Sequence, residues 1–531
     1  MKGSFRILFI FLIIASIIQL PILGVSTDEI FQRDHRLVNA REYFSKASIL
    51  NRAPSTVSEP IFLNEYPFKY YGVGIQYPLI LLEYFPETLS PERPWFWIIS
   101  HAYTHAIFLV SVVAFWSILT MLGASSPLTL LGTTLYALHP RIYGPSFYNI
   151  KDVMFLSLLT IGLWSILRST ISHSRYAWIL AGIVTAFAIN SRVMGLLLVV
   201  LAIGIPVIQF ILRKISLKVV LQSVGIFLLS LAISLYAMWP VLWNNPVQEL
   251  YNALVVFGNY LEWDNVIVFR GQVLSGVSPP IDYVSTWIWI TSPSTYHIAW
   301  IAGIIGAFFL LLKWVLDRSY TPSNITTSAW ISVVVFAGVQ SLLILADSTM
   351  YNAWRHTSFL HLPLTILAVF GVRFLWQIRS QWIRVIGISL ISFSLIHQLE
   401  WIAFNTPFHH LYFNNIIVRD TSNWDRDYWQ LSAKYVIEDV IEREKNDHKI
   451  VFAENLPTLL AFKTLDDSHR DRARIDATVS NIEYLLVDYD GIVGEDIQPP
   501  LLGFEPYRFY QFGNSTIIAV FAHTTRASLM R

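Results

Sequence analysis

The sequence predicts an α-helical protein that crosses a membrane many times, with external loop helices and a small α/β domain at its C-terminal end. Of its 531 residues, 54% are hydrophobic and 14% are charged, whereas a soluble globular chain has about 25% charged residues. Apolar runs of membrane-spanning length recur as far as residue 403, and the composition changes after it. The 19 Trp and 25 Tyr residues are typical of aromatic belts at membrane interfaces.

Charge and cysteine content exclude several classes of function. The net charge is +1, so nothing indicates a nucleic-acid partner. The chain has no cysteine, which excludes disulfides and thiolate metal sites.

The first apolar run, which follows Lys2 and Arg6 and ends near Val25, could be a signal peptide or a first membrane helix. It is longer than the apolar region of a typical signal peptide, and "ILGVS" is a poor cleavage site. We therefore expect an uncleaved membrane helix.

Apolar runs of about 20 residues predict about 11 membrane spans. These spans are 5–24, 95–121, 126–139, 152–168, 177–190, 194–212, 219–240, 296–313, 328–346, 357–375 and 385–403. The third and fifth are short, because Pro, Arg and polar residues end them early.

Lysine and arginine in the short loops predict the orientation, since cytoplasmic loops carry an excess of them. With the N-terminus inside, the inner segments hold Lys2, Arg6, Arg168, Arg175, Arg213, Lys214, Lys218, Lys313, Arg318, Arg379 and Arg384. The loops 25–94, 140–151 and 241–295 and the tail are then external.

The tail 404–531 is predicted to be a separate extracytoplasmic α/β domain that follows a transmembrane domain of residues 1–403. "DYWQLSAKYVIEDVIEREKN" has helical apolar spacing, whereas "KIVFAEN", "IEYLLVDYD" and "STIIAVFAH" are rich in β-branched and aromatic residues.

Two carboxylates, Asp28 and Glu29, follow the first predicted span in "VSTDEIFQRD". Ser26 and Glu29 match a capping box, and the apolar residues that follow recur at helical spacing, which predicts an amphipathic helix on the outer surface. On this interpretation the two acids only begin a helix. The alternative is that they perform the chemistry of the protein.

Other polar clusters are predicted at the same membrane face. They comprise His139, Arg141, Asn149, Lys151 and Asp152 in the segment 138–155; Arg192 in "NSRVMG"; Arg355 and His356 in "DSTMYNAWRHTSFLHLP"; and Glu262, Asp264 and Arg270 in the loop 241–295. Acidic residues favour helix N-termini, which offers a structural explanation for Asp152. Hydrogen-bonded packing is the alternative to catalysis for His139, His356 and His361. Yet ionisable groups at this depth are costly and usually functional.

Fixed cations beside carboxylates indicate a site for a lipid phosphate. Arginine and lysine bind phosphate, and carboxylates deprotonate hydroxyls or bind sugars. A transporter of an anionic solute could collect the same residues.

Several segments, in order, resemble the GT-C glycosyltransferases that use polyprenyl-phosphate sugars, in the branch of protein O-mannosyltransferases and lipid A aminoarabinose transferases. The segments are "TDEIF", "KYYG", "HPRIYGPSFYNIKD", "SRVMG", "WPVLWNNP", "RGQVLSGVSPPIDYVSTWIWITSP", "YNAWRHTSFLHLP" and "DYWQLS". The chain departs from the family pattern at Ile150, where proline is common, and at Pro145, where histidine is frequent.

The resemblance implies transfer of a sugar, most simply a hexose such as mannose, from a polyprenyl phosphate to an acceptor hydroxyl with inversion at the anomeric carbon. Asp28 is the expected catalytic base. The expected substrate-binding residues are Glu29, Lys69, Lys151, Asp152, Arg192, Arg355 and His356. No metal is predicted, although the resemblance leaves open a divalent ion between Asp28 and Asp152.

The expected partners are the lipid-linked sugar, the bilayer and an acceptor protein, lipid or glycan. The expected location is the plasma membrane, with the active site on the extracytoplasmic side. The alternatives are an anionic-solute transporter, a membrane scaffold, or another lipid-linked enzyme such as an oligosaccharide ligase or polymerase. Uncharged span centres disfavour transport.

Overall fold

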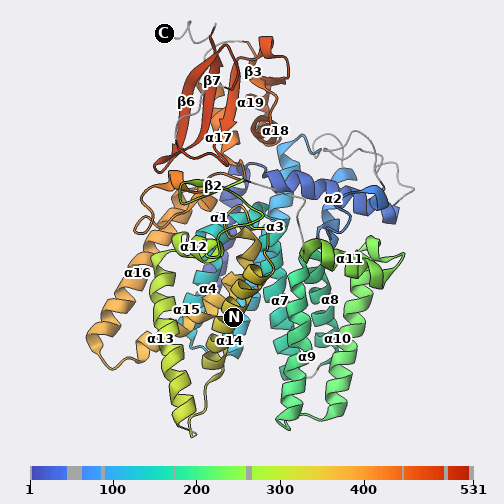
Figure 1. Cartoon of the computed structure of the whole chain (residues 1–531), viewed down its shortest axis with the longest axis vertical. Coiled ribbons are helices and arrows are strands. Elements are labelled where there is room, and N and C mark those ends of the chain that lie inside the picture. Colours follow the sequence, from blue (N-terminus) through green and yellow to red (C-terminus); the bar gives the residue numbers. More distant parts are fainter. Residues whose placement is uncertain are drawn as a thin grey trace.

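The protein is a bundle of long helices with a small sheet domain at one end (Figure 1). The computed structural model describes residues 3–44, 62–84, 90–172, 174–258, 266–317, 319–444, 448–494 and 500–524. Glu262 and Asp264, singled out in the sequence, lie outside the described residues.

Nine helices in the described part of the chain are long and apolar enough to cross a membrane. They are α1 (Gly3–Gln19, extended to Ile22 by a 3-10 turn), α3 (Pro94–Met121), α7 (Asp152–Ser172), α9 (Leu196–Ile211), α10 (Leu217–Met238), α13 (Ser294–Leu316), α14 (Asn324–Leu345), α15 (His361–Gln377) and α16 (Gln381–Phe404). The third and fifth predicted spans are also helices, α4 (Ser126–Leu138) and α8 (Arg175–Ser191), but they have only 13 and 17 residues. The predicted fold class is thus confirmed.

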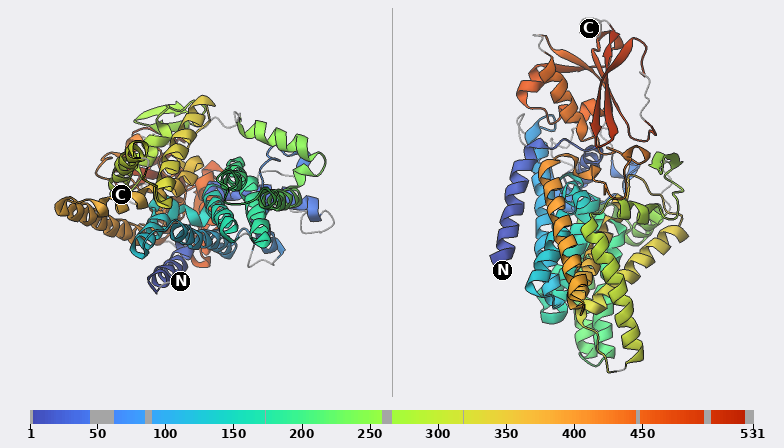
Figure 2. Two further views of the ribbon diagram at one scale, coloured as in Figure 1. Left: turned by 90° about the horizontal axis from the view of Figure 1, so that it is seen from below. Right: turned by 90° about the vertical axis from the view of Figure 1, so that its left-hand side faces the viewer.

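Helices α7 and α15 form the centre of the bundle, because most of their residues are buried. Helix α1 runs along the outside (Figure 2). Large apolar side chains are exposed along the outer helices, among them Ile233, Phe308 and Leu345. Such a belt is expected where a helix faces lipid instead of water.

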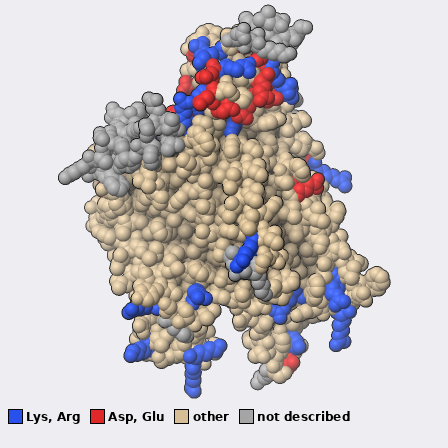
Figure 3. Space-filling model, turned by 180° about the vertical axis from the view of Figure 1, so that it is seen from behind, with Lys and Arg blue, Asp and Glu red and all other residues tan. Residues whose placement is uncertain are grey.

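The two ends of the bundle differ in charge. Figure 3 shows lysine and arginine side chains gathered at the helix ends far from the sheet domain, a belt with few charged side chains between, and mixed charges on the sheet domain. The turns between α9 and α10 and between α13 and α14 lie at this basic end (Figure 1). These two turns, both predicted to be inner, thus lie at the same end, while the assignment of that end to the cytoplasm stays a prediction.

Helix α2 (Thr27–Phe44) lies across the other end of the bundle (Figure 1), but its polar side is not solvated as the amphipathic pattern predicts. All residues from Gln32 to Ala40 are buried. The segment Gly74–Tyr84 packs against this helix and brings Glu83 to Arg33, with two nitrogen–oxygen distances of 2.8 and 2.9 Å. Arg36 lies 3.9 Å from the same carboxylate. Charge pairing therefore allows this polar helix face to be buried.

The tail contains a five-stranded sheet of order β4-β3-β5-β7-β6. The strands are β3 (Ile450–Ala453), β4 (Ala473–Asp476), β5 (Tyr484–Asp488), β6 (Phe504–Phe512) and β7 (Ser515–His523). β3 pairs in parallel with β4 and β5, and β7 pairs antiparallel to β5 and β6. Helix α17 (Ser432–Arg443) packs its apolar side on the sheet, and α18 (Leu456–Phe462) follows β3. The sequence predicts β3, β5, β7 and α17, but not β4 or β6.

The beginning of the tail is bonded to the end of the bundle where α2 lies. The N–H of Thr27 donates to the carbonyl of Trp429, and Lys434 Nζ donates to the carbonyl of Pro21 at 2.8 Å. Asp425 accepts from the N–H of Val268 in the hairpin β1–β2 (Val266–Phe269 and Gln272–Ser275). These bonds bring residues near 429 close to the start of α2.

We expect Glu83→Leu to lower the free energy of unfolding by about 3–5 kcal/mol, because two buried arginines lose their shared carboxylate. Denaturant unfolding in detergent measures the change. Asp467→Asn is the control, because its ion pair with Arg93 is exposed and is worth about 1 kcal/mol or less. Equal effects of the two substitutions would contradict this account.

Candidate functional site

The two carboxylates at the start of α2 have different surroundings. Both oxygens of Glu29 have close polar neighbours: Oε2 accepts from the N–H and the hydroxyl of Ser26, and Oε1 lies 2.9 Å from His101 Nε2. The Glu29 side chain is buried, so it supports the helix start as half of a capping box. Asp28 instead faces Arg355, with 3.0 Å between Oδ2 and Nη1. Its side chain is 25% exposed and is therefore the accessible member of the pair.

The start of α7 holds the second carboxylate. Asn149 Oδ1 accepts from the N–H groups of Lys151 and Asp152, and its amide nitrogen donates to Asp152 Oδ2 at 3.3 Å. This turn fixes the buried Asp152 carboxylate, which forms an ion pair with Arg192 at the end of α8. The ion pair explains why an arginine occurs at a turn where the positive-inside rule does not call for one.

Arg355 begins a 3-10 segment, Arg355–Leu360, that leads into α15. Its guanidinium lies over the rings of Tyr351 and Trp429, at 4.9 and 5.0 Å from their centroids. Nε also donates to His356 Nε2 at 3.3 Å. The backbone just before it is left-handed at Asn352 and Ala353, with φ of 56° and 62°. Such conformations are costly outside glycine and are concentrated at functional sites.

Lys151 lies next to both ion pairs. Its Nζ is 3.6 Å from the centroid of the Tyr71 ring. Burial and the nearby Arg192 hold the pKa of Lys151 well below its usual range, although Asp28 and Asp152 act in the opposite direction. Lys151 is thus electrostatically coupled to all four charged partners.

The "KYYG" segment brings Tyr71 to the site, whereas Lys69 is less well placed. Lys69 is half-buried, and its Nζ lies 5.2 Å from the centroid of the Tyr70 ring. Gly72 makes the close approach possible, because a Cβ atom there would be 2.1 Å from the carbonyl oxygen of Asn190. The segment therefore packs against Asn190, which is two residues before Arg192 in the chain.

The site has three basic side chains and two carboxylates, so it carries an excess of one positive charge when Lys151 is protonated. The basic side chains are Lys151, Arg192 and Arg355, and the carboxylates are those of Asp28 and Asp152. An anion such as a phosphodiester would balance this excess. His356 completes the group, since its nitrogen contacts Arg355.

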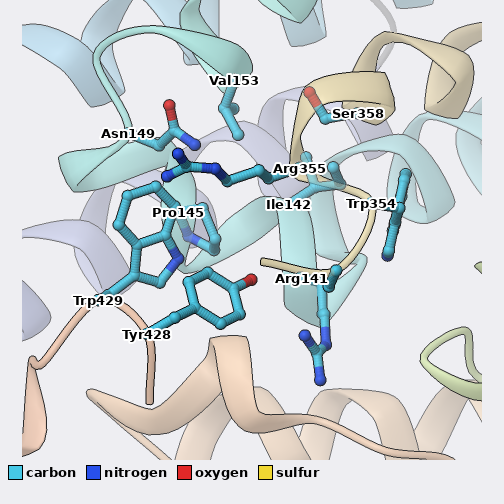
Figure 4. Close-up of a pocket in the computed structure, with 11 residues that line it drawn as sticks. Arg141, Ile142, Pro145, Asn149, Val153, Trp354, Arg355, Ser358, Tyr428 and Trp429 are labelled. Atoms are coloured by element: carbon cyan, nitrogen blue, oxygen red, sulfur yellow. The ribbon is translucent and has the colours of Figure 1, made fainter. Parts of the chain in front are cut away.

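A small cavity adjoins Arg355 and extends to Arg141, with Trp429 and Tyr428 of the tail forming one side (Figure 4). Figure 4 shows the Arg355 guanidinium beside Asn149 and the ring of Trp429. Four residues around the site were not singled out from the sequence: Tyr71, Tyr351, Trp429 and His101. A single aromatic residue or histidine forms no recognisable motif in a chain that is rich in aromatic residues.

Other candidates from the sequence lie elsewhere. Arg270 is exposed and pairs with Asp282. His139 Nε2 lies 3.2 Å from the hydroxyl of Ser292, and His361 Nε2 lies 3.0 Å from the carbonyl oxygen of Tyr136. Hydrogen-bonded packing accounts for both buried histidines.

Asp28 and Asp152 each face an arginine. Within the ranges that the structure describes, no group of three or more His, Asp or Glu side chains is placed to hold a metal ion.

No family model and no curated protein sequence matches the chain. Two solved structures resemble it over nearly its full length. ArnT from Cupriavidus metallidurans bound to undecaprenyl phosphate has 10% identity and a TM-score of 0.43, with 98% of each chain covered. The apo state of the same protein has 11% identity and a TM-score of 0.39, with 97% of each chain covered.

We expect Asn149→Ala to lower the free energy of unfolding by about 1–2 kcal/mol, because the start of α7 loses its side-chain acceptor. Thermal or denaturant unfolding in detergent measures this. Asn514→Ala, on an exposed turn, is the control and should change stability by less than about 0.5 kcal/mol. An unchanged stability of the Asn149 variant would show that the turn does not depend on this side chain.

Proposed function

We propose that the protein is an inverting glycosyltransferase that moves a sugar from a polyprenyl phosphate to an acceptor hydroxyl. The ion pair between Asp28 and Arg355 is the observation that carries the proposal, because it joins a candidate base to a candidate phosphate ligand. The polyprenyl-phosphate donor is inferred from the order of the segments that resemble the GT-C glycosyltransferases. A hexose such as mannose remains the proposed sugar.

In the proposed reaction, the acceptor oxygen attacks the anomeric carbon while the bond from that carbon to the phosphate oxygen breaks. The acceptor proton passes to a carboxylate oxygen of Asp28, and the lipid phosphate leaves with the bonding electron pair. A phosphodiester leaving group needs cationic contacts more than a strong acid. Arg355, Arg192 and Lys151 would supply these contacts.

Donor binding would also release the base. In the structure, Arg355 Nη1 lies 3.0 Å from Asp28 Oδ2. A lipid phosphate that binds Arg355 would compete with Asp28 for the guanidinium, so the carboxylate would gain freedom to accept a proton when the donor is present. The position of Asp28 in the first turn of α2 would keep the carboxylate in place during this exchange, since a helix N-terminus favours a negative charge.

The remaining proposed ligands have secondary roles. Asp152 would position Arg192 and bind the sugar, and His356 would orient Arg355. Glu29 would support Asp28 through the helix start, and Lys69 would meet the lipid phosphate only if its side chain turned toward Lys151. We propose the extracytoplasmic side of the plasma membrane as the location, and the tail 404–531 as a domain that closes one side of the site.

Asp28→Asn should reduce sugar transfer by about 10²–10⁴-fold, because the amide cannot take the acceptor proton. The assay is transfer of radiolabelled sugar from a polyprenyl-phosphate donor, on protein whose insertion and unfolding temperature match the unmodified protein. Glu42→Gln, an exposed position on the same helix, is the matched control and should keep full activity. Near-normal turnover of Asp28→Asn would exclude the base assignment.

Arg355→Ala and Arg192→Ala should each raise the KM for the lipid donor by about tenfold or more, the effect of losing one charge-assisted contact to phosphate. Steady-state kinetics with varied donor and saturating acceptor measure it. Arg270→Ala, which removes an exposed arginine, is the control. An unchanged donor KM in either variant would assign that arginine a structural role.

A further inference from the structure

Arg141 is a buried cation that the proposed reaction does not use. It lies in the short helix α5 (Pro140–Tyr143), and only 6% of it is exposed. Its Nε donates to the carbonyl oxygen of Tyr412 at 3.0 Å. Among the residues that the structure describes, neither Nη1 nor Nη2 makes a hydrogen bond of good geometry, although the Tyr428 hydroxyl interacts with the guanidinium.

No carboxylate within the described ranges forms an ion pair with Arg141. Its guanidinium lies against the rings of Trp287 and Phe413, at 5.2 and 4.9 Å from their centroids. Asp425 acts on it electrostatically, but the oxygens of Asp425 accept from the N–H of Val268 and the hydroxyl of Tyr283. A buried charge without a paired anion is costly, and the cost is removed when an anion binds.

Other polar hydrogens near Arg141 also have no partner. Tyr148 Oη and Trp429 Nε1 are buried without a hydrogen-bond partner in the described structure, and their rings lie 5.7 Å apart. Arg141 and Tyr148 interact electrostatically. Guanidinium and indole N–H groups only donate, and a phenol can donate, so each of these groups requires an acceptor.

This set of donors adjoins the cavity that reaches Arg355. Arg141, Trp429 and Arg355 line the same cavity. Figure 4 shows the guanidinium of Arg141 on the far side of the Tyr428 ring from Arg355, and the Tyr428 hydroxyl points to the Arg141 side. One substrate molecule could therefore meet both arginines at different positions.

We infer that Arg141 binds a second anionic group of the substrate, separate from the phosphate at Arg355. This inference rests on the proposed function. A planar guanidinium whose Nη1 and Nη2 are not paired with a carboxylate can bind a carboxylate or a phosphate through two parallel hydrogen bonds. The second anion would be a carboxylate on the transferred sugar or the second phosphate of a diphosphate donor.

Binding of three synthetic lipids to the full-length protein in detergent separates these sources. The probes are undecaprenyl phosphate linked to glucose, the same lipid linked to glucuronic acid, and undecaprenyl diphosphate linked to glucose. The unmodified protein should bind at least one of the last two about tenfold more tightly than the first, as expected for one added charge-assisted contact. The preferred probe identifies whether the second anion is a carboxylate or a phosphate.

Arg141→Gln should remove this preference and leave binding of the phosphate-linked glucose within about threefold of the unmodified protein. Arg270→Gln should change nothing, because that arginine is exposed and pairs with Asp282. Arg141→Lys keeps the charge but loses the planar pair of donors, so it should retain only part of the preference. If Arg141→Gln fails to fold, the binding preference of Arg141→Lys is the test.

The outcomes separate this inference from the proposed function. Binding of all three lipids with equal affinity by the unmodified protein would overturn the inference and leave the proposed function intact. An equal loss of all three in a folded Arg141 variant would also overturn it, because the role of Arg141 would then be structural. Failure of the unmodified protein to bind any of them would overturn the proposed function itself.

Discussion

The ion pair between Asp28 and Arg355 joins residues that are 327 positions apart in the chain. Charges buried at the end of an apolar bundle persist only when each has a counter-charge or a substrate to pair with. The same constraint explains the pair of Asp152 with Arg192, and it explains how Glu83 allows two arginines of α2 to be buried. Charge pairing therefore determines how the segments between the long helices fold onto the bundle.

The site combines anchored and accessible groups. Asp152 and Glu29 are buried and hold the starts of α7 and α2, whereas Asp28 is the partly exposed carboxylate. This division suits transfer chemistry, in which a rigid frame keeps an ionised group in position while the group itself stays open to substrate. Arg141 adds a cation that pairs with no carboxylate in the described part of the chain, which distinguishes it from the arginines that hold the frame together.

Long apolar runs made the bundle predictable, since the bilayer permits few alternatives to a helix of about 20 residues. The edge strand β6 was not predicted, because Pro506 and several polar residues interrupt its pattern, and proline is tolerated at a sheet edge. The buried polar face of α2 was also unpredicted, because its partner Glu83 lies 50 residues away and no local pattern connects them. For the site, the sequence predicted Asp28, Lys151, Asp152, Arg192 and Arg355 as candidates. It could not predict which carboxylate pairs with which arginine, because tertiary contacts decide that.

The bonds from the tail to the bundle have a consequence for how the protein is made. Trp429 supports Arg355 and bonds to the start of α2, so one side of the site comes from a segment that follows every membrane helix in the described chain. A ribosome must therefore insert the whole bundle and then release the tail before the cavity is closed. During synthesis the site is incomplete, and a chain that stops after α16 carries Asp28 and Arg355 but not the Trp429 ring against which that arginine packs.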